Sequence, residues 1–256
     1  MTKKPLILVT NDDGISAPGM RALINVMHEI GEVVVVAPDK PQSAMGHAIT
    51  INSTLYLNKI SKEGDAITEY SCSGTPVDCV KMAVNEVLKR KPDLCVSGIN
   101  HGSNSSINVI YSGTMSAAVE AGIEGIPAIG FSLCDYDWNA DFETLNELVK
   151  KIALQVLKNG LIEGTVLNVN FPKLKQEEIK GIKICRQAKA MWQEKFEKRT
   201  SPFGKEYYWL SGEFINQDKG EDTDEWALAN GFVSIVPVQF DLTAHHSISV
   251  LNNWNL

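Results

Sequence analysis

The chain has 256 residues, a formal net charge of −7, and a composition that is 44% hydrophobic and 21% charged. This balance is typical of a globular protein, and the length permits one large α/β domain or one domain with a smaller extension. The negative charge argues against a protein that coats DNA or RNA and against a polybasic membrane contact, because both need a positive surface.

The cysteines and the amino-terminal segment bear on the compartment. The five cysteines include no Cys-x-x-Cys pair, and several lie among apolar residues. This pattern favours buried thiols in a reducing compartment. Residues 1 to 5 lack the features of a signal peptide, and no apolar run is long enough to span a membrane. We therefore expect a cytoplasmic protein with no DNA and no membrane partner.

The first part of the chain predicts a strand, a helix and a second strand. Leu6 to Thr10 is a short apolar run, and residues 18 to 29 carry apolar side chains at helical spacing. Glu32 to Ala37 is apolar on both faces, as in a parallel sheet with both faces covered. The order favours a doubly wound α/β core with a mostly parallel sheet.

Asn11, Asp12, Asp13 and Gly14 follow the first strand directly. In open α/β sheets, ligands bind at the carboxyl ends of the strands. Two adjacent carboxylates at that edge suit a hard cation such as Mg²⁺ or Mn²⁺, which takes oxygen ligands. The same residue types also form ordinary solvated turns, so this stretch alone leaves both interpretations open.

A polar loop over residues 38 to 47 follows the second strand and places Ser43, Gly46 and His47 at the same edge of the sheet. A histidine in such a loop is more often a plain surface residue than a ligand. Residues 48 to 58 and 66 to 72 alternate enough to predict extended strands, as a hairpin beside the main sheet.

Two helix starts could hold an anion with their free backbone N–H groups. The first helix is predicted from Pro76 to about Lys89, with Thr75 and Asp78 as a capping box, and capping alone explains those residues. The second start is Ser112-Gly113-Thr114, followed at once by an Ala-rich helix. Small residues there serve either a close ligand or close helix–sheet packing.

The third core strand is predicted from Pro92 to Ser97. It ends in a polar stretch, residues 98 to 106, that carries Asn100 and His101. Metal ligation and phosphate binding both suit these amides and hydroxyls, and a plain flexible loop is the alternative. His101 is predicted to be a surface residue.

The remaining elements complete the core and add an extension. Further strands are predicted over residues 128 to 132 and 165 to 170, with an amphipathic helix over residues 141 to 159 between them. From Lys173 onwards aromatic residues increase, residues 206 to 215 resemble one arm of a hairpin, and residues 217 to 225 predict an exposed acidic turn. A late strand is predicted over residues 232 to 237. Such an aromatic arm packs on another subunit or covers its own core.

Several common signatures are missing: the P-loop, the Gly-x-Gly-x-x-Gly dinucleotide fingerprint after the first strand, and the Gly-x-Ser-x-Gly elbow. In contrast, three predicted strand ends deliver oxygen donors, namely Asp12 with Asp13, then Ser43, then Asn100. One divalent cation with a phosphate beside it is the simplest interpretation.

Five motifs in order resemble one known family. They are Asn11-Asp12-Asp13-Gly14; Ala37-Pro38-Asp39 with Ser43-Ala44 and Gly46-His47; Ser73-Gly74-Thr75-Pro76 with Asp78-Cys79; Ser97-Gly98-Ile99-Asn100; and Tyr111-Ser112-Gly113-Thr114. Together they resemble the SurE family, which consists of metal-dependent nucleoside-monophosphate phosphatases. The resemblance covers nearly the whole chain and is strongest over residues 6 to 132.

The resemblance implies a fold and an assembly. The fold would be a Rossmann-like, three-layer α/β core (about residues 1 to 172 of a single domain spanning 1 to 256), with a carboxyl-terminal β-hairpin arm (within about residues 173 to 256). The assembly would be a homodimer or homotetramer formed through that arm.

It also implies hydrolysis of nucleoside 5′- and 3′-monophosphates. One Mg²⁺ or Mn²⁺ would be held by Asp12, Asp13, Ser43 and Asn100, with Asp12 or Asp13 as the acceptor of a proton from water. The phosphate would lie against Asn11 and Ser112-Gly113-Thr114, and Gly46 and His47 are further substrate-binding candidates.

The chain departs from the family in one place, because Ser106 and Asn108 stand where many relatives carry glycine and aspartate. The loop that follows Asn104 can therefore differ in shape from that of the relatives.

Two other classes of function remain open from the sequence. A non-catalytic sensor could use the same ligands to bind metal and nucleotide without turnover. A phospho-accepting receiver domain also has paired acids after a first strand, but it needs an aspartate at the end of the middle strand. Here that strand ends in Ser97-Gly98-Ile99-Asn100, which argues against a receiver domain.

Overall fold

The computed structural model describes residues 4–255. Over these residues the core is a nine-stranded sheet in the order β3-β4-β2-β1-β5-β6-β7-β11-β8. The strands are β1 (Leu6–Thr10), β2 (Glu32–Pro38), β3 (Leu57–Lys59), β4 (Thr68–Cys72), β5 (Leu94–His101), β6 (Ala128–Leu133), β7 (Thr165–Phe171), β8 (Ile182–Ile184) and β11 (Val233–Gln239). The strands from β4 to β7 run parallel, whereas β3 and β11 pair antiparallel with their neighbours β4 and β7.

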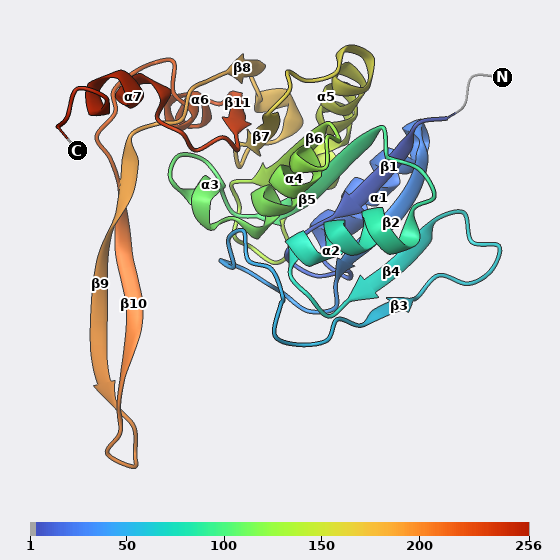
Figure 1. Cartoon of the computed structure of the whole chain (residues 1–256), viewed down its shortest axis with the longest axis horizontal. Coiled ribbons are helices and arrows are strands. Elements are labelled where there is room, and N and C mark those ends of the chain that lie inside the picture. The colour runs from blue at the N-terminus through green and yellow to red at the C-terminus, as the bar shows by residue number, and fades with distance from the viewer. Residues whose placement is uncertain (1–3, 256) are drawn as a thin grey trace.

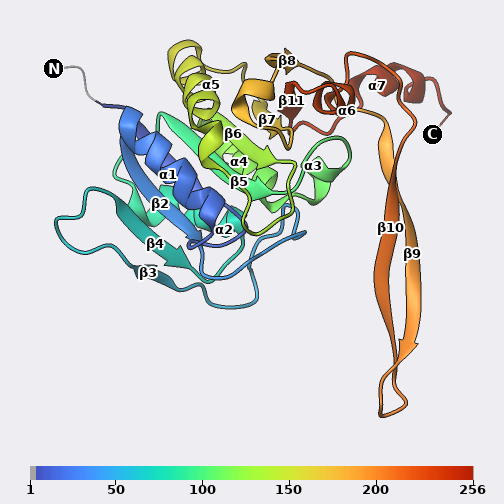
Figure 2. The same cartoon turned by 180° about the vertical axis from the view of Figure 1, so that it is seen from behind.

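Helices cover both faces of the sheet, which gives a three-layer α/β/α core (Figures 1 and 2). Ile7 and Val9 of β1 face the layer that contains α1 (Pro18–Ile30) and α5 (Asn146–Asn159). Leu6 and Leu8 face the opposite layer, which contains α2 (Pro76–Met82) and α4 (Gly113–Ile123). Burial on both faces explains why the parallel strands read as continuous apolar runs in the sequence. The predicted α/β fold with a mostly parallel sheet is confirmed.

The order of the strands places a ligand-binding edge at the centre of the sheet. β2 lies on one side of β1 and β5 lies on the other, and both run parallel to β1. The chain therefore changes direction across the sheet next to β1, which is the topological switch point where open α/β sheets bind ligands. The loops that follow β1, β2 and β5 all leave from this edge.

A long hairpin, β9 (Ala190–Thr200) with β10 (Glu206–Asn216), forms a separate two-stranded sheet. In both views it projects away from the core (Figures 1 and 2). Its aromatic side chains are largely exposed, as Phe196 and Trp209 show with 65% and 59% of their surface accessible. The predicted hairpin is therefore confirmed, and it does not cover the core of its own chain.

The hairpin is not the whole of the carboxyl-terminal part. β8 and β11 lie on either side of it in the sequence and both join the main sheet, so part of the predicted extension is built into the core. Between them lies the short helix α6 (Asp224–Ala229), and α7 (His245–Leu251) follows β11. Of the helices within residues 4–255, none is long and apolar enough to cross a membrane.

Some boundaries differ from the sequence-based predictions. In residues 48 to 58 only Leu57–Lys59 forms a strand, and the rest is irregular chain anchored by side chains. α2 ends at Met82 and continues as a π-helical turn, Ala83–Val87. β5 continues past Ser97 to His101, because Asn100 and His101 pair with Ser132 and Leu133 of β6 after a shift in register.

The stretch from residue 217 to residue 225 was predicted to be an exposed acidic turn, and this is wrong for part of it, although Glu221 and Asp222 are exposed. Thr223 and Asp224 are fully buried, and Asp218 is ion-paired with Arg186. The acidic side chains are used as hydrogen-bond acceptors at the base of the hairpin, so composition alone was a poor guide to their exposure.

The capping box at the start of α2 is confirmed, and it generates a stability prediction. Asp78 accepts hydrogen bonds from the backbone N–H of Thr75 and from both the N–H and the hydroxyl of Thr50. We expect Asp78→Ala to lower the free energy of unfolding by about 1–2 kcal/mol, measured by urea titration. The exposed Glu63→Ala is the control, and an equal urea midpoint for the Asp78 variant and the parent would contradict the prediction.

The difference in the free energy of unfolding between the parent and Asp78→Ala should depend on pH. Burial raises the pKa of Asp78, but the hydrogen bonds from Thr50 and Thr75 outweigh it and hold that pKa below its usual value. A carboxylate of this kind stabilises the fold above its unfolded pKa, and the contribution is lost as the pH falls through the folded pKa. The gap between the parent and Asp78→Ala should therefore narrow below about pH 4.

Candidate metal and phosphate site

A cavity of about 190 Å³ opens at the switch point of the sheet. Its walls include all four predicted metal ligands, Asp12, Asp13, Ser43 and Asn100, together with Ser112 at the start of α4. No group of three or more His, Cys, Asp and Glu side chains suited to a metal gathers within residues 4–255. A cation at this edge would therefore use two carboxylates, an amide and a hydroxyl, which is the all-oxygen set that Mg²⁺ and Mn²⁺ accept.

Asp12 is held firmly at the end of β1. Only 4% of its surface is accessible, and its Oδ1 accepts a hydrogen bond from the Thr114 hydroxyl at 2.5 Å. Gly113 leaves room for the carboxylate, since a Cβ at this position would lie 2.6 Å from the Asp12 Cβ and 2.8 Å from its Oδ2. Gly113 and Thr114, predicted as phosphate-binding residues, therefore also position an acid.

The electrostatics of the pair suit a cation. Burial, followed by repulsion from Asp13, raises the pKa of Asp12 to about 6, and the hydrogen bond from Thr114 opposes this rise only in part. A divalent cation between the two carboxylates would remove the repulsion and replace the lost water. The buried Nε2 of His101, a residue that lines the cavity, has no hydrogen-bond partner among residues 4–255, so a polar group remains available there. The residues present thus fit a hard cation.

His101 positions the second acid. Its backbone N–H donates to Asp13 Oδ2 at 3.3 Å, and its Nδ1 lies 3.2 Å from the same oxygen. The imidazole stacks on Trp138 and meets Phe142 edge-on. The prediction of a surface histidine is wrong, because two aromatic side chains from the segment after β6 pack against the ring and only 10% of its side chain is accessible.

The two neutral ligands reach the cavity through backbone contacts. The Gln42 N–H donates to the Asp12 carbonyl at 2.7 Å and draws the loop that carries Ser43 over the end of β1. Asn100 donates with Nδ2 to the carbonyls of His101 and Gly102. Its Oδ1 is thereby left as an acceptor, which is the atom that a hard cation requires.

Five other predicted site residues do not line this cavity, namely Asn11, Gly46, His47, Gly113 and Thr114. Asn11 is buried behind the two acids and donates with Nδ2 to the carbonyl of Gly14 at 2.9 Å. The Gly46 N–H donates to the carbonyl of Tyr111. His47 Nε2 lies 2.9 Å from Glu120 Oε2, and its ring lines a different cavity.

A buried amide network that sequence reasoning missed supports the polar loop after β5. Asn104 donates to Ser132 through Nδ2 and to Asn170 through its backbone N–H, both at 2.8 Å. Asn168 in turn donates to the Asn104 carbonyl. The available signal was the pair Asn168 and Asn170, two residues apart in an otherwise apolar strand and therefore on one face.

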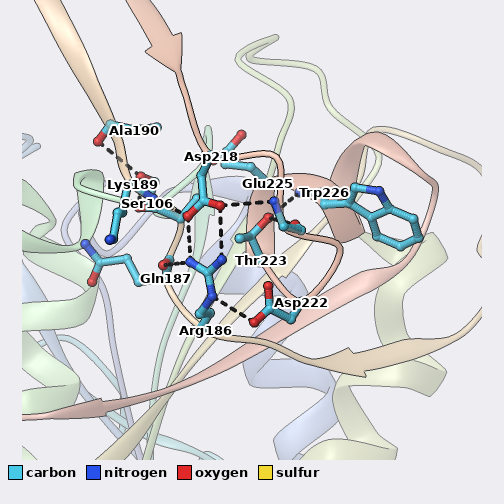
Figure 3. Close-up of polar contacts among 12 residues, drawn as sticks. Ser106, Arg186, Gln187, Lys189, Ala190, Asp218, Asp222, Thr223, Glu225 and Trp226 are labelled. Carbon is cyan, nitrogen blue, oxygen red and sulfur yellow. Dashed lines mark hydrogen bonds and ion pairs between the residues drawn. The ribbon is translucent and has the colours of Figure 1, made fainter.

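The base of the hairpin is tied to the same polar loop (Figure 3). The Ser106 hydroxyl donates to the carbonyls of Ala188 and Ala190, and its N–H donates to Asp224 Oδ2 at 2.7 Å. Asp224 Oδ1 also accepts from the N–H of Ala188. Ser106 adopts a positive φ of 54°, a conformation that glycine adopts freely. A serine here adopts that backbone conformation and adds a hydroxyl group that bonds to the carbonyls of Ala188 and Ala190.

An ion pair reinforces this junction. Arg186 makes a two-pronged contact with Asp218, at 2.6 and 3.0 Å, and a third hydrogen bond to Asp222 at 2.8 Å (Figure 3). The side chain of Asp218 is largely buried, whereas that of Asp222 is exposed. These contacts thus join the segment between β10 and α6 to the segment between β8 and β9, which carries Arg186.

Comparison with known proteins points to one family. Residues 7–194 match the profile described as survival protein SurE. A protein of Flavobacterium psychrophilum named 5′-nucleotidase SurE is 80% identical over 99% of this chain and 98% of its own length. A Bacteroides fragilis protein of the same name is 48% identical over 99% of both chains. The crystal structure of the SurE protein from Aquifex aeolicus superposes with a TM-score of 0.85 at 41% identity, covering 97% of this chain and 98% of that one.

The contact between Gly113 and Asp12 can be tested directly. We expect Gly113→Ala to displace the Asp12 carboxylate and to weaken Mn²⁺ binding by about tenfold or more, measured by isothermal titration calorimetry. Gly122→Ala is the matched control. Gly122 lies on the same helix as Gly113, but a Cβ there would meet Val166 and Phe240, away from the acids. Equal Mn²⁺ affinity for the two variants would show that Gly113 has no particular role at the site.

Proposed function

The chain belongs to the SurE family, and from this premise we propose that it is a 5′-nucleotidase that hydrolyses nucleoside 5′-monophosphates, and also 3′-monophosphates, to nucleoside and phosphate. The names of its close relatives support this activity. The observation in the chain itself that carries the proposal is the pairing of Asp12 and Asp13 in one cavity with two further oxygen donors.

The proposal includes one divalent cation, Mg²⁺ or Mn²⁺, in each subunit. Asp12, Asp13, the Ser43 hydroxyl and the Asn100 Oδ1 would hold it. Such a cation supplies Lewis-acid activation of a phosphoryl oxygen and of a water molecule. Its positive charge would also allow both neighbouring carboxylates to be ionised at neutral pH.

The phosphate would bind beside the cation at the start of α4. Ser112 caps this helix by accepting from the N–H of Met115, and it also lines the metal cavity, so the start of the helix lies beside the acids. A helix N-terminus attracts an anion through these N–H groups and the helix dipole. Gly113 and Thr114 supply such groups, and Asn11 is the candidate for a further contact from behind the acids. Gly46 and His47 are further candidates, and His47 lines a separate cavity.

Proton transfer falls to the acid pair. In hydrolysis a water oxygen forms the new bond to phosphorus, and the ester oxygen leaves with the nucleoside. One carboxylate, of Asp12 or of Asp13, would accept the water proton, and the leaving alkoxide would take up a proton from that carboxyl group or from solvent water. Asp13 is held by His101 and is the more accessible of the two, whereas Asp12 is buried and hydrogen-bonded to Thr114.

Removal of either acid provides the test of the proposed activity. We expect Asp12→Asn and Asp13→Asn each to lower Mn²⁺-dependent phosphate release from AMP and GMP by at least about 100-fold, with unchanged circular dichroism. Asp65→Asn, at an exposed loop acid, is the control. Parent-like turnover by either site variant would refute the assignment.

Metal removal separates the enzyme from a non-catalytic nucleotide sensor. The purified protein should release phosphate over many turnovers with Mn²⁺, stop when EDTA is added, and recover when Mn²⁺ is restored in excess. A sensor with the same ligands would bind nucleotide in a one-to-one ratio and release no phosphate. Stoichiometric binding without turnover would therefore replace the enzyme proposal with the sensor.

We also propose that the chain forms a homodimer or homotetramer through the β9–β10 hairpin and works in the cytoplasm. Exposed aromatic side chains along a projecting hairpin support the first point, since such surface is typical of an interface. All five cysteines are free thiols and four of them are buried, which supports a reducing compartment.

The role of the hairpin can be tested by shortening it. Replacing residues 195–211 with Asn-Gly would join Glu194 to Gly212, which face each other in the sheet, through a two-residue turn. We expect this variant to have a smaller mass by size exclusion with light scattering, because it loses most of the exposed aromatic surface. The parent mass per particle, corrected for the deletion, would count against assembly through the hairpin.

A further inference from the structure

We propose that a second cavity, which adjoins the metal site, binds the base of the nucleotide, with Trp192 as the stacking surface. This inference rests on the proposed nucleotidase function. It assigns a substrate-specificity role to a residue at the base of the hairpin, where the sequence indicated only an assembly role.

The metal cavity is too small to hold a whole nucleotide. Its volume is about 190 Å³, whereas pockets for small-molecule ligands typically measure about 300–1,000 Å³. A nucleoside monophosphate with its phosphate at the acids must therefore extend into neighbouring space.

One neighbouring cavity provides that space. It measures about 320 Å³ and shares Ser103, Asn108 and Tyr136 with the wall of the metal cavity. The larger cavity beside His47, of about 530 Å³, has no lining residue in common with the metal cavity. Of these two cavities, the first is therefore the one that adjoins the metal cavity.

The walls of the adjoining cavity suit a flat aromatic ring. Trp192 and Phe214 are paired across β9 and β10, with ring centroids 5.4 Å apart, and both line the cavity. Tyr136 lies on the shared wall and is 74% accessible. Bases stack on exposed aromatic faces of this kind whatever their identity, so such walls indicate a nucleobase.

The cavity also holds a polar group for the edge of a base. Glu225 accepts a hydrogen bond from Ser105 through Oε1, while its Oε2 accepts none from residues 4–255. A carboxylate oxygen in this position can accept from the amino or imino N–H groups that nucleobases present. The same cavity therefore offers aromatic side chains for stacking on a base and a carboxylate oxygen for its edge.

Trp192 is held in position from the side of the active site. Its Nε1 donates to Asn108 Oδ1 at 2.8 Å, and the neighbouring strand end is clamped by Ser106 (Figure 3). Asn108 and Ser106 thus make the contacts that set the place of the stacking ring.

A pair of substrates that differ in the base tests the proposal. We expect Trp192→Ala to lower kcat/KM for AMP by about tenfold, mainly by raising KM. The loss with ribose 5-phosphate, which lacks a base, should stay within about twofold. Trp192→Phe keeps a stacking ring and should recover most of the AMP activity.

Trp209→Ala, an exposed tryptophan farther along the same hairpin, is the matched control, and the mass of every variant is checked by light scattering. Equal losses with AMP and ribose 5-phosphate would show a general structural effect and overturn the base subsite. The absence of any loss with AMP would overturn it as well.

A binding measurement separates this proposal from the nucleotidase activity. Adenosine, which has no phosphate, should bind about tenfold more weakly to Trp192→Ala than to the parent in calorimetry. If no substrate releases phosphate but this difference is found, the proposed activity fails and the base subsite stands. If phosphate release is normal and adenosine binding is equal in both proteins, the base subsite fails alone.

Discussion

The site depends on the burial of one carboxylate beside another at the end of β1. Asp12 has almost no access to water, and Asp13 follows it directly, so the pair repels itself unless a cation is present. Burial and repulsion from Asp13 disfavour the ionised form of Asp12, and Thr114 and Gly113 hold it in place from the start of α4. The parallel sheet makes this possible, because strands covered on both faces deliver their loops to one edge.

The polar loop from residue 102 to residue 108 connects the site to the rest of the molecule. One end is supported by the buried asparagines of β7, and the other is clamped to the base of the hairpin through Ser106 and Asp224. Its side chains line both the metal cavity and the adjoining aromatic cavity. A movement of the hairpin relative to the core would therefore change the shape of both cavities.

Much of the fold, and the gathering of four oxygen donors around one cavity, could be predicted from local patterns. Helix α1, strands β1 and β2 and one arm of the hairpin follow from periodicity, and the place of the two acids follows from the apolar strand before them. Errors arose where a polar side chain has a distant partner. His101 was taken for a surface residue because nothing nearby in the sequence shows that Trp138 and Phe142 cover it. Asp224 was read as part of an exposed turn because Ser106, its partner, lies 118 positions away.

The sequence by itself determined the α/β class, the carboxyl edge as the place of the site, and the oxygen donors Asp12, Asp13, Ser43 and Asn100. Hydrophobic periodicity and the order of the predicted elements along the chain are properties of the sequence, so they can be identified without a three-dimensional structure. Only the tertiary structure decided that Thr114 holds Asp12, that His47 lines a separate cavity, and that Trp192 lines a cavity next to that of the two acids. These relations join residues far apart in the chain, and packing rather than spacing brings them together.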